Sequence, residues 1–483
     1  MVEREPEDRK TGNPGAFSQG AEREIDRNGI VELSRLVGDF LASVRYEDIP
    51  DDCRSIAIDA FIDTVAVMMA GVREPVVSLI NKEVLRPEPT EARVCLSDVS
   101  AWAPDAALVG GTAAHAHDLD DQSLTGHPSA ILVPTILAEA DSLECNGREM
   151  ITAYVAGYEV WAELIRRSSD YHQKGWHPTS VFGVVASAAA VSVLRKLTSQ
   201  EAVRAMAIAA SHAGGLAANF GTMTKPYHAG FACKNGVLSA RLAAAGMTAT
   251  DDPFENAKGF LVAFGPDKNP DLESESLLGR DWYLARQKLC VKKYPTCYFM
   301  HRSFDAALKL TRGRILKGAD VQSVEVFMGS GQATVLVYDR PQTGLQAKFS
   351  EQFAMAAALI LGKMGIEELR DEVVQRQDIQ AFFPKVSITP VDESDERDPA
   401  HSPTERVVIT LNNGEVLDSG PVRTIPGHAD EPLTEEELWD KFKYCTAETH
   451  SDSEARSLFE TLKALPDLDT VHEIPIGQRI FQR

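Results

Sequence analysis

Residues with chemical potential concentrate in one stretch of the chain, His115–Ser129 (HAHDLDDQSLTGHPS), which holds three histidines and three aspartates. The segments on either side, 106–114 and 130–140, are apolar and rich in alanine, which predicts two buried helices. The polar residues between them therefore lie where two helices meet, away from bulk water. We expect a functional site at this junction.

Three interpretations of this stretch are open. Aspartate and histidine at close spacing can bind a metal ion, although the ExxH and HExxH patterns of helical metal sites are absent. A histidine beside a carboxylate is also the usual unit of general acid–base catalysis, because the carboxylate fixes the imidazole tautomer and shifts its pKa. In the third, structural interpretation, Asp118, Asp120 and Asp121 cap helices and His127 is a polar residue at a helix start. Spacing alone does not choose between the last two, and it favours both over a metal site.

Three further segments place a titratable residue beside proline or glycine. His177, in GWHPTS, stands at the start of an apolar helix, where free N–H groups suit a substrate carboxylate. Lys225 lies in an expected loop, NFGTMTKPYHAG, that leads into a helix of small residues, and Lys292 lies in VKKYPTCY. Taken one at a time, a histidine or lysine in such a place is more often structural or solvated than functional.

The composition limits the classes of protein to consider. A net charge of −22 over 483 residues argues against binding to nucleic acid or an anionic membrane, so a local cluster of basic residues must attract any anionic ligand. The seven cysteines are scattered and lack CxxC spacing, which favours a reducing compartment over a disulfide framework or zinc ribbon. No apolar run approaches the roughly 18 residues of a membrane span, and the N-terminus has no hydrophobic signal core. We expect a soluble, cytoplasmic protein.

Hydrophobic periodicity predicts a mainly α fold with at least two domains. Residues 1–28 have the composition of a disordered tail. Residues 29–270 have helical periodicity throughout and predict an all-α domain. Residues 271–429 mix strand and helix patterns, and predict a smaller α+β domain. The segment 430–483, which begins with a capping box at Thr434, predicts helices that rejoin the all-α domain.

Within the α+β segment, alternating residues predict a strand, and an Asn-Asn-Gly turn predicts a hairpin. The expected strands are 321–328, 406–411 and 415–417, and the expected helices are 348–361 and 366–375.

Taken together and in this order, HAHDLDD…GHPSA, GWHPTS, GTMTKPYHAG…NGVLSA and KKYPTC resemble the signature segments of the MmgE/PrpD family, over residues 29–470. The resemblance implies a large all-α domain, an inserted α+β lid, an active site in the cleft between them, and a homodimer. Known members include 2-methylcitrate dehydratases, cis-aconitate decarboxylases and iminodisuccinate epimerases. They move a proton next to carboxylates, or release CO2 or water there, without a metal or an organic cofactor.

The resemblance also implies roles for individual residues. Asp118, His127 and His177 match positions that are expected to be catalytic, and Lys225 and Lys292 match positions that are expected to bind substrate. Gln122 and Tyr338 are two further candidates for binding the substrate. His127 or His177 would transfer the proton, Asp118 would hold the geometry, and the two lysines would neutralise substrate carboxylates. Departures from the family pattern lie at the same place and would reshape the pocket. They are His117 in place of an apolar residue, Gln122 in place of Thr or Ser, and a shortened segment between Asp121 and His127.

The sequence therefore predicts a cytoplasmic, metal-free and cofactor-independent lyase that dehydrates or decarboxylates a small di- or tricarboxylate. One alternative is an epimerase of a dicarboxylate such as iminodisuccinate, because GTMTKP and GWHPTS are similar to that branch of the family. The other is a non-catalytic helical scaffold protein with the same fold. No nucleic-acid or membrane partner is expected.

Overall fold

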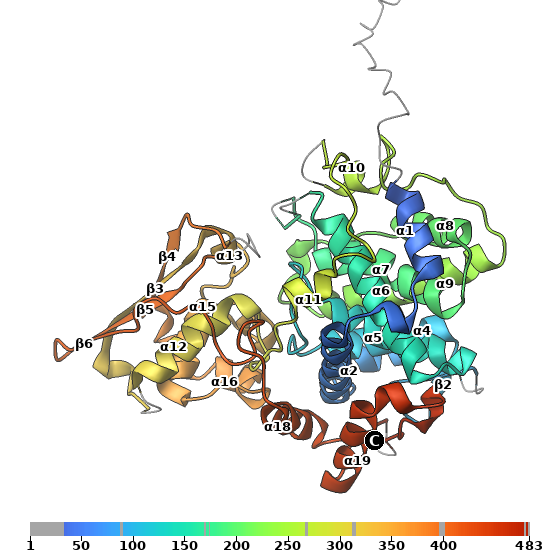
Figure 1. Ribbon diagram of the computed structural model, residues 1–483. Coiled ribbons are helices and arrows are strands. Elements are labelled where there is room, and N and C mark those ends of the chain that lie inside the picture. The colour runs from blue at the N-terminus through green and yellow to red at the C-terminus, as the bar shows by residue number, and fades with distance from the viewer. Residues whose placement is uncertain are drawn as a thin grey trace, which may run out of the picture.

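The computed structural model describes residues 33–86, 90–168, 171–172, 174–265, 269–311, 315–395, 401–477 and 480–481. In this part of the chain helices dominate, which confirms the mainly α prediction. Figure 1 shows a large assembly of helices beside a smaller part that carries a four-stranded sheet. The tail expected at residues 1–28 lies outside the described residues.

The larger assembly, called the helical part below, has three central helices, α4, α5 and α7, that are buried along nearly their whole length. They are apolar on all sides, as expected of helices surrounded by other helices. Among the described helices, none is long and apolar enough to cross a membrane alone, and α2 and α3 pass only as a pair bent by 87°. The helices here are α1 (Leu33–Ser43), α2 (Asp51–Gly71), α3 (Pro75–Val84), α4 (Ala103–His115), α5 (Pro128–Leu143), α6 (Gly147–Ile165), α7 (Pro178–Leu194), α8 (Ser199–Ala210), α9 (Thr224–Ala244), α10 (Phe260–Phe264) and α11 (Tyr283–Gln287).

Helices α4 and α9 pack backbone to backbone. A Cβ atom added to Gly111 of α4 would lie 3.0 Å from the Cα of Gly230 in α9, so a larger residue at this crossing would push the helices apart. The two helices run in opposite directions, since Asp105 near the start of α4 pairs with Lys234 of α9 at 2.6 Å. The close antiparallel contact places the C-terminal end of α4 against the first turn of α9.

The start of α9 differs from the sequence prediction. Lys225 was expected in a loop, but the helix begins at Thr224, so Lys225 and His228 both lie in its first two turns. Pro226 does not prevent this, because the first turn of a helix leaves its N–H groups without intrahelical partners. The loop prediction was wrong because the helix extends through the proline.

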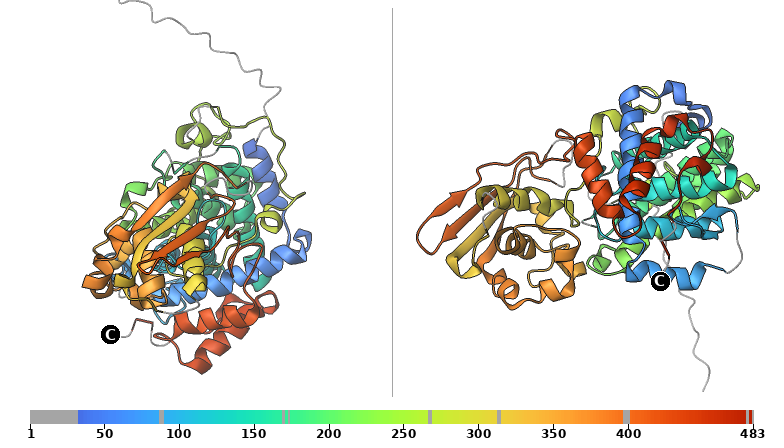
Figure 2. Two further views of the ribbon diagram at one scale, coloured as in Figure 1. Left: turned by 90° about the vertical axis from the view of Figure 1, so that its left-hand side faces the viewer. Right: turned by 90° about the horizontal axis from the view of Figure 1, so that it is seen from below.

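The smaller assembly, called the sheet part below, has its own hydrophobic core, formed by residues from Tyr294 to Leu411. Its strands lie in the order β4-β3-β5-β6, with β3 parallel to β4 and antiparallel to β5. Helices pack against this sheet from one side (Figure 2). The elements are α12 (His301–Thr311), β3 (Val321–Gly329), α13 (Ser330–Ala333), α14 (Gly344–Ala347), α15 (Glu351–Ala356), a π-helical turn (Ala357–Leu361), α16 (Asp371–Val374), α17 (Gln377–Gln380), β4 (Val386–Val391), β5 (Arg406–Leu411) and β6 (Val416–Asp418).

The expected strand and hairpin are confirmed by β3, β5 and β6. The helix expected at 348–361 is confirmed from Glu351 on, as α15 continued by the π-helical turn, but it begins later than predicted. Ser350 caps α15 by accepting a hydrogen bond from the N–H of Phe353. Lys348 therefore lies in the junction before that helix. The helix expected at 366–375 is a 3₁₀ turn, Glu367–Leu369, followed by the short α16.

The C-terminal helices, α18 (Glu435–Thr446) and α19 (Asp452–Lys463), contribute to the core of the helical part. The capping box at Thr434 is present as predicted. In Figure 1 both helices lie below α2. The boundaries 29–270, 271–429 and 430–483 stay a prediction.

One ion pair ties α18 to the centre of the molecule. Lys441 of α18 reaches the wholly buried Asp63 of α2, with Nζ 2.5 Å from Oδ1. The same ammonium donates a hydrogen bond to the carbonyl of Leu119 at 2.9 Å. The C-terminal segment thereby holds both α2 and the loop that follows α4.

We predict that Lys441→Met lowers the free energy of unfolding by about 3 kcal/mol or more, because it leaves the Asp63 carboxylate buried without its cation. Urea unfolding measures the change. The matched control is Asp63→Asn combined with Lys441→Met, which removes both charges and should recover much of the loss. A double variant as unstable as the single one would contradict this explanation.

Candidate active site

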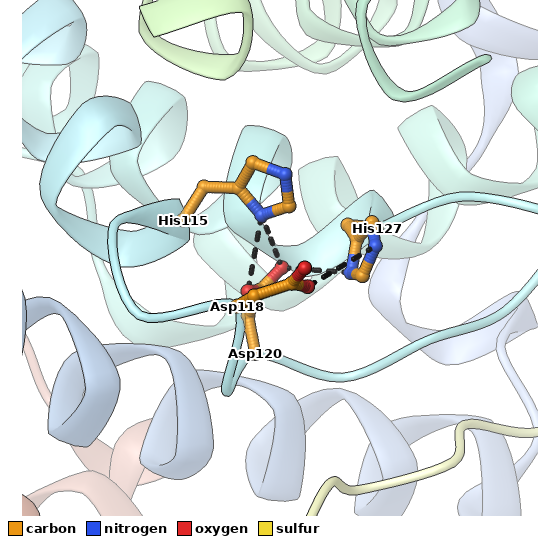
Figure 3. A group of neighbouring side chains, drawn as sticks. All are labelled: His115, Asp118, Asp120 and His127. Carbon is orange, nitrogen blue, oxygen red and sulfur yellow. Dashed lines mark hydrogen bonds and ion pairs between the residues drawn. The ribbon is translucent and has the colours of Figure 1, made fainter. Parts of the chain in front are cut away.

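The loop between α4 and α5 gathers the polar side chains of His115, Asp118, Asp120 and His127 in one place (Figure 3). The chain turns sharply after α4, and Asp118 adopts a left-handed backbone conformation with φ 55°. Aspartate tolerates this conformation better than most residues, and such strain is common at functional sites. The junction predicted from the sequence is confirmed as buried. The structural interpretation is wrong for the aspartates, since none of them caps α4 or α5, but His127 does lie at the start of α5, as that interpretation expected.

Asp118 is the centre of this cluster, because two lysines converge on its carboxylate. Lys225 from α9 donates to Oδ2 at 2.8 Å. Lys292, from the segment before α12, donates to the carbonyl oxygen of Asp118 at 2.8 Å and also to Oδ1. Burial alone would raise the pKa of Asp118, but the two ammonium groups outweigh it and hold the pKa well below its usual range. The carboxylate is therefore ionised, and the two lysines are buried rather than solvated.

Asp120 orients two imidazoles. Its carboxylate lies 3.0 Å from Nδ1 of His115 and 2.9 Å from Nδ1 of His127. An ionised carboxylate only accepts hydrogen bonds, so each Nδ1 carries the proton and each Nε2 presents a lone pair. The Nε2 of His115 accepts a hydrogen bond from Lys225 at 3.0 Å, and the Nε2 of His127 lies 3.8 Å from Asp118.

Both imidazoles are uncharged at neutral pH. Burial lowers the pKa of His115 to about 4, although the neighbouring Asp120 opposes the shift. Burial lowers the pKa of His127 as well. The resting site therefore offers two neutral bases with fixed tautomers.

Two further histidines flank the cluster. His177, at the start of α7, stacks on the ring of His115 with centroids 5.7 Å apart, and its Nδ1 lies 3.3 Å from Nδ1 of His228. His117 lies away from the pocket described below, with Nε2 3.2 Å from the carbonyl of Ala70. Burial lowers the pKa of His117 to about 3, so it is neutral.

The other two substrate-binding candidates lie at the edge of the site. The Tyr338 hydroxyl donates to the carbonyl of Phe220 at 2.8 Å, just before Gly221 at the pocket wall. The backbone of Gln122 pairs with Cys290, and the residue lines a separate cavity of about 730 Å³. The structure thus brings Asp118, Lys225, Lys292, His127 and His177 together, whereas Gln122 lines the separate cavity.

The pocket at the cluster lies between the two parts of the molecule. His115, Asp118 and Lys225 line it from the helical part, and Lys348 and Phe349 line it from the sheet part. It holds about 10 Å³ of space, room for about one water molecule. A carboxylic acid substrate therefore enters only after side chains or the two parts move.

The donor atoms could in principle ligate a metal ion. One donor atom from each of His115, Asp118, Asp120 and His127 lies within 4.8 Å of the others. However, the ammonium groups of Lys225 and Lys292 already neutralise Asp118 and would repel a divalent cation. The donor set therefore does not fit a metal, and metal-free activity stays a prediction.

Comparison with known proteins finds two family models along the chain. Residues 35–273 match the MmgE/PrpD N-terminal domain, and residues 294–466 match the MmgE/PrpD C-terminal domain. The chain belongs to the MmgE/PrpD family.

Three curated proteins illustrate the similarity within the MmgE/PrpD family. Human cis-aconitate decarboxylase is 28% identical over 382 residues, which cover 75% of this chain and 77% of that protein. The cis-aconitate decarboxylase-like protein oryM of Aspergillus oryzae is 25% identical over 431 residues, covering 84% and 88%. The cis-aconitate decarboxylase of Aspergillus terreus is 24% identical over 478 residues, covering 93% and 96%.

Sequence reasoning missed three residues of this MmgE/PrpD site. His115 lines the pocket, and it is the first residue of the sequence motif from which the site was predicted. Asp120, two residues after Asp118, could have been assigned as the orienting carboxylate from the same spacing. Lys348 carried no signal, because it lies outside the four motifs and reaches the pocket only through the packing of the sheet part.

A third carboxyl group, that of Asp121, lies next to the cluster and is wholly buried. Burial, helped by the nearby Asp63, raises its pKa from 3.8 to about 8. Between these values the folded protein keeps a proton that the unfolded chain releases, so stability falls as pH rises, by at most about 1.4 kcal/mol per pH unit.

We therefore predict that Asp121→Asn gains stability relative to the wild type as pH rises from about 5 to about 8. Urea unfolding at several pH values measures the difference in free energy of unfolding. The control is Asp98→Asn at an exposed position, for which the difference should stay constant. A constant difference for Asp121→Asn as well would mean that this carboxyl is ionised in the folded protein.

Proposed function

We propose that this protein is a lyase that decarboxylates a small tricarboxylate of the cis-aconitate type, using side chains alone. The observation that carries the proposal is the convergence of two buried ammonium groups on Asp118, beside His115 and His127. Such an arrangement binds carboxylates and supplies bases with fixed tautomers. The cis-aconitate decarboxylases among its relatives support the same reaction class.

The proposed reaction is a decarboxylation coupled to one proton transfer. The carbon–carbon bond to one carboxylate breaks and CO2 leaves. The electron pair of that bond forms a new double bond to the adjacent carbon, while the pair of the original double bond shifts to its far carbon and the carboxylate on it. The far carbon of that double bond then takes one proton. Lys225 and Lys292 stabilise the negative charge that spreads onto the remaining carboxylate, because the electrostatic attraction of an ammonium group is stronger in a site that excludes water.

A histidine supplies the proton. Binding of a polyanion next to His115 and His127 raises the pKa of these imidazoles, so one of them enters the reaction as imidazolium. It transfers its proton to the substrate carbon and recovers one from solvent after the product leaves. Asp120 keeps the ring in place throughout, since it holds Nδ1.

The two alternatives use the same residues differently. An epimerase of a dicarboxylate would also need bases beside carboxylate-binding lysines, and would remove and return a proton on opposite faces of one carbon. A scaffold protein would not need this cluster. Burying ammonium groups costs free energy, and apolar residues at the same positions would avoid that cost. We therefore place the scaffold last.

The decisive assay incubates the purified protein with cis-aconitate, 2-methylcitrate and iminodisuccinate in separate reactions, followed by proton NMR and CO2 detection. We expect CO2 release from cis-aconitate, unchanged by EDTA. Turnover of 2-methylcitrate alone would assign dehydration, and exchange of the iminodisuccinate α-proton alone would assign epimerisation. Activity that EDTA abolishes and one divalent ion restores would overturn the metal-free mechanism.

We further predict that Asp120→Asn lowers kcat about 10²- to 10⁴-fold with little change in KM, because the amide no longer fixes both Nδ1 protons. Steady-state kinetics measures both constants. Asp121→Asn is the matched control, since this neighbouring carboxyl is already protonated and its side chain orients no imidazole. Equal losses in the two variants would show that the loop as a whole, and not the orientation of the imidazoles, had been disturbed.

A further inference from the structure

Lys348 is a third lysine at the pocket. It belongs to the junction between α14 and α15 in the sheet part, and it lines the pocket together with Asp118 and Lys225. Its side chain is 5% exposed. Its ammonium group donates to the carbonyl of Ala116 at 2.9 Å, in the loop that carries the site.

The three lysines differ in how many of their N–H groups are engaged. Each ammonium has three N–H donors. Lys225 uses two of them on Asp118 and His115, and Lys292 uses two on Asp118. Lys348 uses one, on a neutral carbonyl, and forms no ion pair with any carboxylate of the described residues. Lys348 therefore has the greatest capacity to bind an added anion.

The surroundings keep this ammonium at the pocket without neutralising it. Burial lowers the pKa of Lys348 to about 8, while Glu74 and Asp118 act in the opposite direction and the other two lysines add to the shift. Burial in turn raises the pKa of Glu74. A buried cation without a counter-ion is costly, and an anionic ligand at this position would remove that cost.

We propose that Lys348 binds a third carboxylate of the substrate and makes the site selective for tricarboxylates over dicarboxylates. Lys225 and Lys292 bind two carboxylates from the helical part, and Lys348 binds the remaining one from the sheet part. The inference rests on the proposed function, because it assigns the substrate class of the same site. It depends on binding alone, so it can be tested separately from turnover.

The test measures binding of two unreactive acids by calorimetry. Tricarballylate has three carboxylates, and glutarate has the same chain with the central carboxylate removed. We expect the wild type to bind tricarballylate at least about tenfold more tightly than glutarate. Lys348→Met should weaken tricarballylate binding about 10- to 100-fold and change glutarate binding less than about threefold, as loss of one charge-assisted hydrogen bond predicts.

Two control variants separate charge from packing. Lys348→Arg keeps a cation and should recover part of the tricarballylate affinity. Lys293→Met removes a lysine whose side chain is 47% exposed, and it should change neither affinity. Near-wild-type glutarate binding by Lys348→Met also serves as the check that this variant is folded.

The outcomes distinguish the inference from the proposed function. Equal weakening of both acids in Lys348→Met, or a wild type that does not prefer tricarballylate, would overturn the role of Lys348, whatever reaction the enzyme performs. A wild type that does not decarboxylate cis-aconitate but shows the expected pattern of binding would overturn the proposed reaction and leave Lys348 as the third carboxylate ligand.

Discussion

Burial of the Asp118 carboxylate is the constraint on which the rest of the site depends. A carboxylate without water is stable only if cations or hydrogen-bond donors surround it, and here two ammonium groups do so. Lys225 and Lys292 come from places more than sixty residues apart in the chain, so the tertiary fold has to bring them together. The backbone contact between Gly111 and Gly230 matters for this reason, since it sets the end of α4, which leads to Asp118, against the start of α9, which carries Lys225.

The fold was predictable wherever a local pattern decides the structure. Apolar periodicity located the central helices, the Asn-Asn-Gly turn located the hairpin, and Thr434 marked the start of α18. The prediction failed where tertiary packing overrides the local signal. Pro226 suggested a loop, yet the helix runs through it because small residues beyond it pack against α4. Lys348 was missed for a related reason. The carbonyl of Ala116, to which it donates a hydrogen bond, lies over two hundred residues away, and no residue near Lys348 in the sequence indicates that contact.

The candidate site was predictable in its parts but not in its hydrogen bonding. The motifs identified Asp118, His127, His177 and the lysines, yet they did not show which carboxylate holds the imidazoles. That distinction needs coordinates, because Asp118 and Asp120 are two residues apart and chemically identical in the sequence. The environments of the two carboxylates differ. Asp118 faces ammonium groups and balances their charge, whereas Asp120 faces imidazoles and fixes their tautomers.

The pocket lies between the two parts of the molecule, so the contacts across it bear on how a ligand would enter. The contacts that the described residues make across the pocket include the hydrogen bond from Lys348 to Ala116 and that from the Tyr338 hydroxyl to the carbonyl of Phe220. The ring of Phe349 also stacks on Phe220 at 5.4 Å and lies 5.2 Å from the Lys225 ammonium. The neutral hydrogen bond of Tyr338 contributes only about 1 kcal/mol net, whereas a bond that involves a charged group, such as that of the Lys348 ammonium, contributes about 1.5–3 kcal/mol. In the proposed binding mode, a substrate carboxylate would replace the carbonyl of Ala116 as the acceptor for Lys348. One charge-assisted hydrogen bond would then take the place of another, and the attraction between opposite charges would be added to it.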